Sequence, residues 1–151
     1  MPEKSAGLTI APLTPRHVDD MARLEALCFS LPWSRAMILS ELNNPNAVYL
    51  AAEWDGALAG YAGMQTVLDE GYITNVATAP GFRRRGVASK LLDALRAQAE
   101  QRALSFLTLE VRCSNRAAIA LYHKHGFQSI GVRPGYYEKP REDALIMTLY
   151  L

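Results

Sequence analysis

The segment that most limits the possible folds runs from Tyr72 to Arg112, where a strand, a basic turn, a long helix and a second strand follow one another. "YITNVAT" and "SFLTLEVR" read as strands, and a helix with apolar residues at helical spacing is expected between them, from about Gly86 to Arg102. Two strands joined by a long helix are connected most naturally by a parallel crossover. The chain is therefore expected to form a sheet with at least one parallel pair.

The patterns outside this segment add elements on both sides of it. Their order, β-α-α-β-β-β-α-β-α-β-β overall, predicts a single α/β domain over residues 1–151, with a central mixed sheet (α+β) flanked by helices. The expected elements are a strand over Leu8–Leu13, a helix starting at Thr14-Pro15, a short helix capped by Ser34, a hairpin turning at Asp55-Gly56, a strand following Asp69-Glu70-Gly71, a helix capped by Ser114 and ending at Gly126, and strands over Phe127–Val132 and Ala144–Tyr150.

Charge and cysteine usage exclude several classes of protein. With 16 basic and 15 acidic residues the net charge is +1, so the chain lacks the global positive field typical of nucleic-acid binders. Cys28 and Cys113 are too few for a disulfide framework and have no metal-binding spacing, which indicates a reducing compartment and no metal site. No signal peptide and no run of eighteen apolar residues is visible. We expect a cytoplasmic protein without membrane or direct nucleic-acid contact, acting as a monomer.

The turn "GFRRRGVASKLL" places three arginines at the start of the long helix. A glycine-rich turn into a helix points backbone N–H groups at one spot and suits a phosphate. Val87 and Ala88 stand where a P-loop would require Lys and Ser or Thr, and the GxGxxG dinucleotide pattern is absent. The loop is therefore expected to hold a pyrophosphate without reacting with it, as a coenzyme A site does. The alternative is an ordinary exposed basic turn.

At this point the sequence resembles the GNAT superfamily of N-acetyltransferases. "RRRGVA" is similar to the Q/R-x-x-G-x-G/A acetyl-CoA signature of that family, and the order of elements matches its fold. "PWS", "YITNVAT", "LEVRCSNRAAIALYHKHGF" and "GYY" followed by "EDALIM" resemble, more narrowly, the ribosomal-protein-alanine N-acetyltransferases. The resemblance extends from about Cys28 to the C-terminus. It implies the acetyltransferase fold and acetyl-CoA as co-substrate.

The resemblance also implies roles for individual residues. Glu110 would be the general base and Tyr122 the general acid. Two positions are less typical of the family, since Ala88 replaces a commoner glycine and Thr78 a commoner valine, and neither is expected to prevent cofactor binding. The implied cofactor contacts are Val76, Ala77 and Thr78 along the pantetheine arm, Arg84, Arg85, Gly86, Val87, Ala88 and Ser89 around the pyrophosphate, and Asn115. The residues implied to flank the peptide channel are Trp33 and Ser34, between the first two helices, and Tyr136, Tyr137 and Glu138, in the loop before the last strand.

Each implied role has a structural alternative. Alternation in "FLTLEVR" puts Glu110 on the face opposite Leu107, Leu109 and Val111, where it can instead pair with Arg112 or a loop arginine. Tyr122 can pack against Phe127 in a Schellman cap. The proposed channel residues can serve in core or loop packing. A covalent mechanism through Cys113 is a further alternative without a motif to support it.

The expected function follows from these assignments. An N-terminal amine has a pKa near 7.7 to 8.0, so about one-tenth of it is already neutral at pH 7. A weak general base is therefore sufficient. Glu110 is expected to act through a water or with a raised pKa. We expect an acetyl-CoA-dependent N-alpha-acetyltransferase that transfers acetyl directly to the N-terminal alanine of small-subunit ribosomal protein eighteen. The alternatives are an acetyltransferase of lysine side chains or small amines, and a non-catalytic acyl-CoA-binding module.

Overall fold

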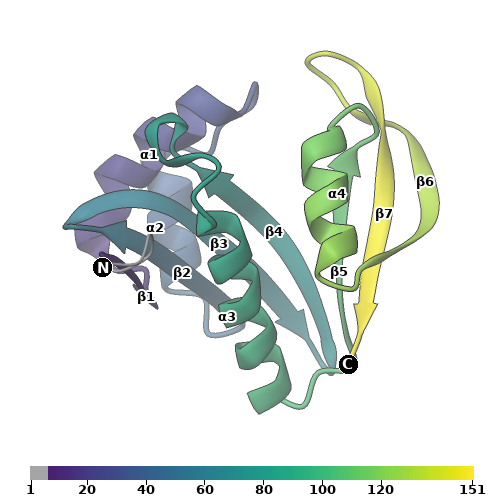
Figure 1. Ribbon diagram of the computed structural model, residues 1–151, viewed down its shortest axis with the longest axis horizontal. Helices are drawn as coiled ribbons and strands as arrows, with labels where there is room; N and C mark the ends of the chain where they lie inside the picture. The colour runs from purple at the N-terminus through teal and green to yellow at the C-terminus, as the bar shows by residue number, and fades with distance from the viewer. Residues whose placement is uncertain (1–6) are drawn as a thin grey trace.

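A seven-stranded mixed sheet, in the order β1-β2-β3-β4-β5-β7-β6, organises the molecule (Figure 1). The computed structural model describes residues 7–151, so the first six residues of the expected domain lie outside the described part. The element order is the predicted one. The strands are β1 (Leu8–Pro12), β2 (Ala47–Trp54), β3 (Ala57–Val67), β4 (Glu70–Thr78), β5 (Phe106–Arg112), β6 (Gln128–Tyr137) and β7 (Glu142–Tyr150).

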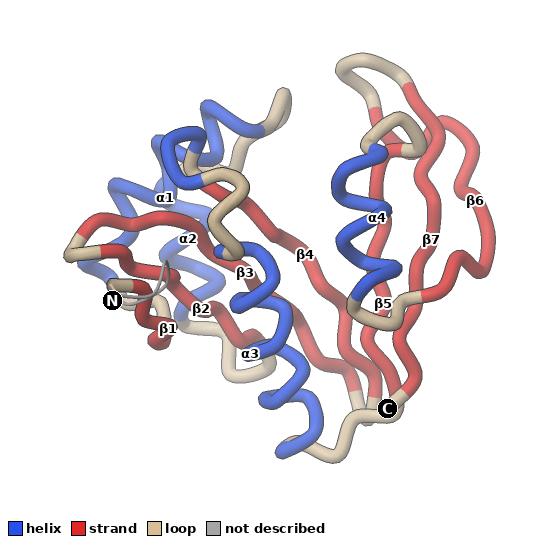
Figure 2. The backbone as a smooth tube through the Cα atoms, in the orientation of Figure 1, coloured by secondary structure: helices blue, strands red, loops and turns tan. Residues whose placement is uncertain are grey.

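Helices cover both faces of the sheet, with α1 and α2 on one face and α3 and α4 on the other (Figure 2). Each pair of helices covers its own apolar cluster, one built around Met21, Ile38 and Tyr61 and the other around Leu91, Leu107 and Met147. Among residues 7–151, no helix has both the length and the apolarity needed to cross a membrane. The helices are α1 (Val18–Cys28), α2 (Arg35–Leu42), α3 (Val87–Gln101) and α4 (Arg116–Lys124), with 3-10 turns η1 (Pro15–His17) and η2 (Pro80–Phe82).

The predicted helix signals are confirmed in two places and wrong in one. Gly126 has φ of +92°, and the Phe127 N–H donates to the Tyr122 carbonyl at 3.0 Å, which completes the expected Schellman motif at the end of α4. Ser34 caps α2 as expected, accepting from the Met37 N–H at 3.2 Å. The predicted cap Ser114 is a residue too early, because the Asn115 side chain accepts from the Ala118 N–H at 3.2 Å.

The two tight turns between β2 and β4 show how local φ angles set strand ends. Asp55 and Gly56 have φ of +50° and +87°, which confirms the predicted type I′ hairpin. The next turn comes earlier than expected, because Leu68 takes the positive φ of +54° and β4 begins at Glu70. Gly71 thus lies inside the strand, where a Cβ would come within 2.7 Å of Leu107 Cδ2.

The predicted parallel crossover exists, but the two strands that it joins stay together only briefly. β4 pairs with β5 at three positions, from Glu70↔Phe106 to Tyr72↔Thr108. Beyond these, β4 continues along β3 while β5 pairs with β7 along its whole length. The sheet therefore divides into two halves, and the edge of β4 that faces β5 is unpaired from Ile73 to Thr78.

The last two strands are longer than predicted. β6 extends to Tyr137 through an irregularity between Arg133 and Tyr137, and Tyr137 pairs with Glu142 of β7. Tyr136 and Tyr137 were expected in a loop but lie at the end of a strand. The reason is that a bulge absorbs the intervening Pro and Gly, which lets pairing resume beyond them. Glu138 lies in the turn that follows.

Candidate active site

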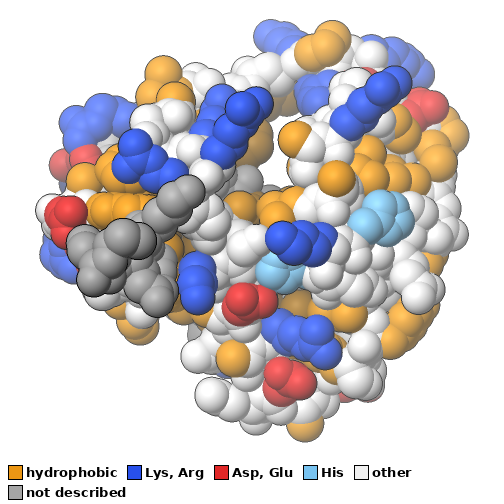
Figure 3. Space-filling view, viewed as in Figure 1, with side chains coloured by type: hydrophobic (Ala, Val, Ile, Leu, Met, Phe, Trp, Pro, Cys, Tyr) orange, Lys and Arg blue, Asp and Glu red, His pale blue; other side chains and the backbone are white. Residues whose placement is uncertain are grey.

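A cavity of about 690 Å³ opens where β4 and β5 separate. The space-filling view shows the hollow between the two halves of the molecule, with Lys and Arg side chains on its rim (Figure 3). One wall comes from α1 and β4, and the other from β5, α4 and the β6–β7 hairpin. The predicted residues that line it are Trp33, Val76, Glu110, Asn115, Tyr122, Tyr136, Tyr137 and Glu138.

Glu110 reaches the cavity from β5. Leu107, Leu109 and Val111 are buried on one face of the strand, as the alternation predicted, and Glu110 lies on the other face, with 27% of its side chain exposed. Its Oε1 accepts from Arg133 Nε of β6 at 3.1 Å. The predicted alternative was thus right that the carboxylate is ion-paired but wrong about the partner.

Arg112, the partner expected for Glu110, holds the hairpin instead. Its Nη1 donates to the Pro140 carbonyl at 2.8 Å and to Glu142 at 3.2 Å, and its guanidinium lies 4.4 Å from the centre of the Tyr137 ring. Glu142 also accepts from the Ser114 N–H at 2.6 Å, and these contacts hold the pKa of the Glu142 carboxyl below its usual range. Tyr137 is thereby fixed over the cavity.

Tyr122 enters the cavity from α4. The side chain is 8% exposed, and burial raises the pKa of its phenol to about 12. Its ring also packs against Phe127, with 5.8 Å between ring centres, as the structural alternative predicted. A cavity-lining phenol that is protonated at neutral pH can donate a proton, so the packing role and the proposed chemical role are compatible.

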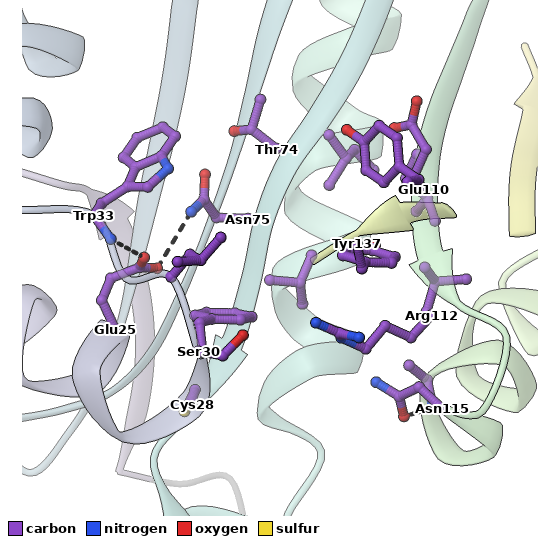
Figure 4. Close-up of a pocket in the computed structure, with 18 of the residues that line it drawn as sticks. Glu25, Cys28, Ser30, Trp33, Thr74, Asn75, Glu110, Arg112, Asn115 and Tyr137 are labelled. Atoms are coloured by element: carbon purple, nitrogen blue, oxygen red, sulfur yellow. Dashed lines mark hydrogen bonds between the residues drawn. The ribbon is translucent and has the colours of Figure 1, made fainter. Parts of the chain in front are cut away.

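A buried polar cluster on the opposite wall was missed by the sequence analysis (Figure 4). Glu25 of α1 is 1% exposed, and its carboxylate accepts from the Trp33 N–H at 2.8 Å, from Asn75 Nδ2 at 3.3 Å and from the Tyr61 hydroxyl. The signal was present in the sequence. Glu25 follows Met21 by four residues on the apolar face of its helix, and Asn75 precedes the buried Ala77 by two residues on the α1 side of β4.

The residues expected to bind coenzyme A follow the open edge of β4 toward α3. Val76 lines the cavity, Ala77 is buried against the α1 side, and the Thr78 carbonyl lies 3.9 Å from Cys28 Sγ. Gly86, with φ of +79°, precedes the first turn of α3, and a Cβ there would meet no atom within 4 Å. An unpaired strand edge leading to a helix N-terminus fits a ligand with an amide-containing arm and a pyrophosphate.

The side chains of the basic loop point in different directions. Arg85 lies over the rings of Trp54 and Phe82, at 5.6 and 5.8 Å from their centres, and Arg84 has a left-handed φ of +63°. His125, the residue directly after α4, bonds Ser89 Oγ at 3.0 Å and so ties the start of α3 to the end of α4. The loop is therefore braced by packing on one side and by a hydrogen bond on the other.

The structure does not bring every predicted residue to the cavity. Ser34 uses its hydroxyl as the cap of α2, and Cys113 is exposed in the turn after β5. Neither residue lines the cavity, whereas Cys28 does. Within the described residues, no group of three or more His, Cys, Asp or Glu side chains could hold a metal ion.

Comparison with known proteins identifies the family. The sequence model of the Acetyltransferase (GNAT) family matches residues 18–127. The chain belongs to the GNAT acetyltransferase family. It is 40% identical over 148 residues to the ribosomal protein bS18-alanine N-acetyltransferase of Haemophilus ducreyi, a match that covers 94% of this chain and 99% of that relative.

Solved structures show the same GNAT fold. The ribosomal-protein-S18-alanine N-acetyltransferase from Escherichia coli superposes with a TM-score of 0.87 at 35% identity, covering 95% of this chain and 93% of that one. Ard1 from Thermoplasma volcanium superposes with a TM-score of 0.88 at 25% identity, covering 96% and 98%. The fold class and the family predicted from the motifs are therefore confirmed.

Proposed function

We propose that this GNAT enzyme transfers acetyl from acetyl-CoA to the N-terminal alanine of a ribosomal protein, the homologue of bS18. The observation that carries the proposal is the cavity at the split of β4 and β5, which Glu110 and Tyr122 reach from separate elements. The names of the relatives at 37 to 40% identity support the choice of substrate.

Acetyl-CoA fits the open edge of β4 and the loop at the start of α3. Backbone groups of Val76 to Thr78 would pair with the pantetheine arm, and the N–H groups of the Arg84 to Ser89 loop would hold the pyrophosphate. The co-substrate supplies a thioester carbonyl. An unpaired backbone N–H of β4 near that carbonyl would stabilise the negative charge that develops on its oxygen.

The side chains divide the proton transfers between them. Glu110, held by Arg133 at 3.1 Å, would accept the proton that the substrate amine loses, directly or through a water. Tyr122, whose pKa burial raises to about 12, would donate its proton to the departing sulfur. Acetyl would pass directly from sulfur to nitrogen. Cys113, the thiol considered for an acyl-enzyme, does not line the cavity.

The test is a thiol-release assay with purified protein, acetyl-CoA and a peptide beginning Ala-Arg. We expect free thiol, a mass increase of one acetyl group on the peptide, and no reaction with the same peptide already acetylated at its N-terminus. If thiol were released with the blocked peptide when it contains lysine, the enzyme would be a lysine acetyltransferase. If none of the amine acceptors led to release of thiol, the result would contradict the catalytic proposal and favour an acyl-CoA-binding module.

A further inference from the structure

The polar cluster of Glu25, Tyr61 and Asn75 has no part in the chemistry proposed above, although two of its members line the cavity. Glu25 and Asn75 are 1% and 7% exposed. All three partners of the Glu25 carboxylate donate to it. Burial raises the pKa of the Tyr61 phenol, so this hydroxyl keeps its proton and remains a donor at neutral pH.

The carboxyl group of this cluster has neutral partners only. None of the ion pairs formed within residues 7–151 includes Glu25. Arg83 comes close to the end of α1 but contacts Cys28 Sγ, at 4.0 Å. Buried carboxylates are usually compensated by a cation, whereas this one has only neutral donors. The wall of the cavity beside Glu25 therefore favours a ligand with a positive charge or with several N–H donors.

Asn75 lines the cavity and carries a buried acceptor that has no donor among the described residues. Its Nδ2 donates to Glu25, which fixes the orientation of the amide and turns Oδ1 away from the carboxylate (Figure 4). Among the described residues, no donor reaches this buried Oδ1. A buried acceptor without a donor destabilises the folded protein, so Oδ1 is set to gain from a donor supplied by a ligand.

We propose that Asn75 Oδ1 accepts an N–H of the substrate's terminal amine, and that Glu25 is the positioning residue that fixes the Asn75 amide. This inference rests on the proposed function, since it assigns the amine end of that substrate. Once the ammonium group has lost one proton, the neutral amine can donate an N–H to Oδ1 and still use its lone pair to attack the thioester. The subsite therefore favours a substrate with a free amino group and discriminates against a peptide that lacks one.

The variant Glu25→Gln tests the assignment because it reverses the Asn75 amide. The Trp33 N–H continues to occupy the side-chain oxygen at position 25, so the new amide nitrogen faces Asn75. Asn75 must then turn its oxygen inward and its NH2 toward the cavity, where it repels an amine. We expect the KM for a peptide beginning Ala-Arg to rise about tenfold or more, and the KM for acetyl-CoA to stay within about twofold.

A second substitution should restore the site. Combining Glu25→Gln with Asn75→Asp puts a carboxylate at position 75, which accepts from the new glutamine with one oxygen and from the amine with the other. We expect the peptide KM to return to within about threefold of the original value. The matched control is Tyr49→Phe, which removes a hydroxyl bonded to Thr74 Oγ1 at 2.9 Å and should leave both KM values unchanged.

Calorimetry in the presence of CoA supplies a readout that needs no turnover. The wild-type protein should bind the alanine peptide about tenfold or more tightly than a peptide beginning with propionyl in place of alanine, and Glu25→Gln should abolish the preference. If Glu25→Gln fails to fold, Asn75→Val removes the acceptor without changing α1 and should give the same loss.

Two results would overturn the assignment. One is a folded Asn75→Val or Glu25→Gln protein with an unchanged peptide KM and an unchanged preference for the amine. The other is a parallel rise in the KM of both substrates, which indicates a merely structural role. If the wild-type protein acetylates no amine at all, the proposed function fails, and the calorimetric comparison of amine and propionyl peptides still decides whether Asn75 marks an amine subsite.

Discussion

Glu25 and Glu110 lie on opposite walls of the same cleft, and the protein surrounds them differently. Glu25 is buried and accepts only from neutral donors, whereas Glu110 is 27% exposed on its side chain and pairs with Arg133. The first arrangement fixes an acceptor and, within residues 7–151, gives the carboxyl group no cationic partner, which suits binding of an amine. The second keeps a carboxylate accessible to solvent, which suits proton transfer. Both side chains line the cavity that forms where β4 and β5 separate.

The strongest test of this division is Glu110→Gln. If Glu110 accepts the proton of the substrate amine, kcat of this variant should fall about 100-fold or more, and its KM for acetyl-CoA should stay within about twofold. Steady-state thiol release measures both constants. An unaffected kcat would mean that Glu110 only forms the ion pair with Arg133 and takes no part in proton transfer.

Tyr122→Phe tests the proposed acid on the same side of the cleft. The ring and its contact with Phe127 remain, so we expect kcat to fall about 10- to 100-fold with little change in the temperature of unfolding. Activity that survives intact would reduce Tyr122 to its packing role. Circular dichroism during heating provides the control for folding.

The pH profile of the wild-type enzyme adds to this test. The proposed role of Tyr122 as an acid requires a protonated phenol. Because burial raises the pKa of this phenol to about 12, we expect activity to fall only above about pH 11. We expect kcat/KM to rise as the substrate amine deprotonates near pH 8 and then to stay level to pH 10.5. A fall centred near pH 10 would indicate a tyrosine with its ordinary pKa.

Arg133→Ala should have a smaller effect. The pair with Glu110 is partly exposed, and such pairs contribute little to stability. We expect kcat to fall about two- to fivefold because the carboxylate loses its fixed position, with no change in the KM for acetyl-CoA. A loss as large as that of Glu110→Gln would instead make the guanidinium part of the chemistry.

Glu142→Gln should have the smallest effect, on the stability of the hairpin that covers the β5 wall. The pKa of Glu142 is lowered in the folded protein, so its contribution is present above its unfolded pKa and is lost as pH falls through the folded pKa. We expect a decrease in Tm of no more than about 3 °C at pH 7 that shrinks toward pH 4. A decrease in Tm that does not change with pH would show that the ionised Glu142 carboxylate is not the source of the stabilisation.

Much of the fold was predictable because it depends on local patterns. The Asp55-Gly56 hairpin, the end of α4 at Gly126 and the parallel crossover each follow from a few neighbouring residues. The place where β4 and β5 part was not predictable from one sequence, because it depends on which neighbour each strand prefers. That separation creates the cavity.

The candidate site was predictable where a family motif existed and was missed where only burial gave a signal. Glu110 and Tyr122 were assigned from motifs and do line the cavity. Arg133, which pairs with Glu110, lies 23 residues away along the chain, and the bulge in β6 hides its register. Glu25 and Asn75 are polar residues at positions where the helix and strand periodicities predict buried apolar side chains. A search for such positions would have found them.

The most direct test of the proposed function is acetylation of one peptide that carries both a free N-terminal alanine and an internal lysine, followed by mass spectrometry of its fragments. The proposed function predicts acetyl on the α-amine, with loss of this product in Glu110→Gln at unchanged acetyl-CoA affinity. Acetyl on the lysine side chain, with the N-terminus left free, would contradict it.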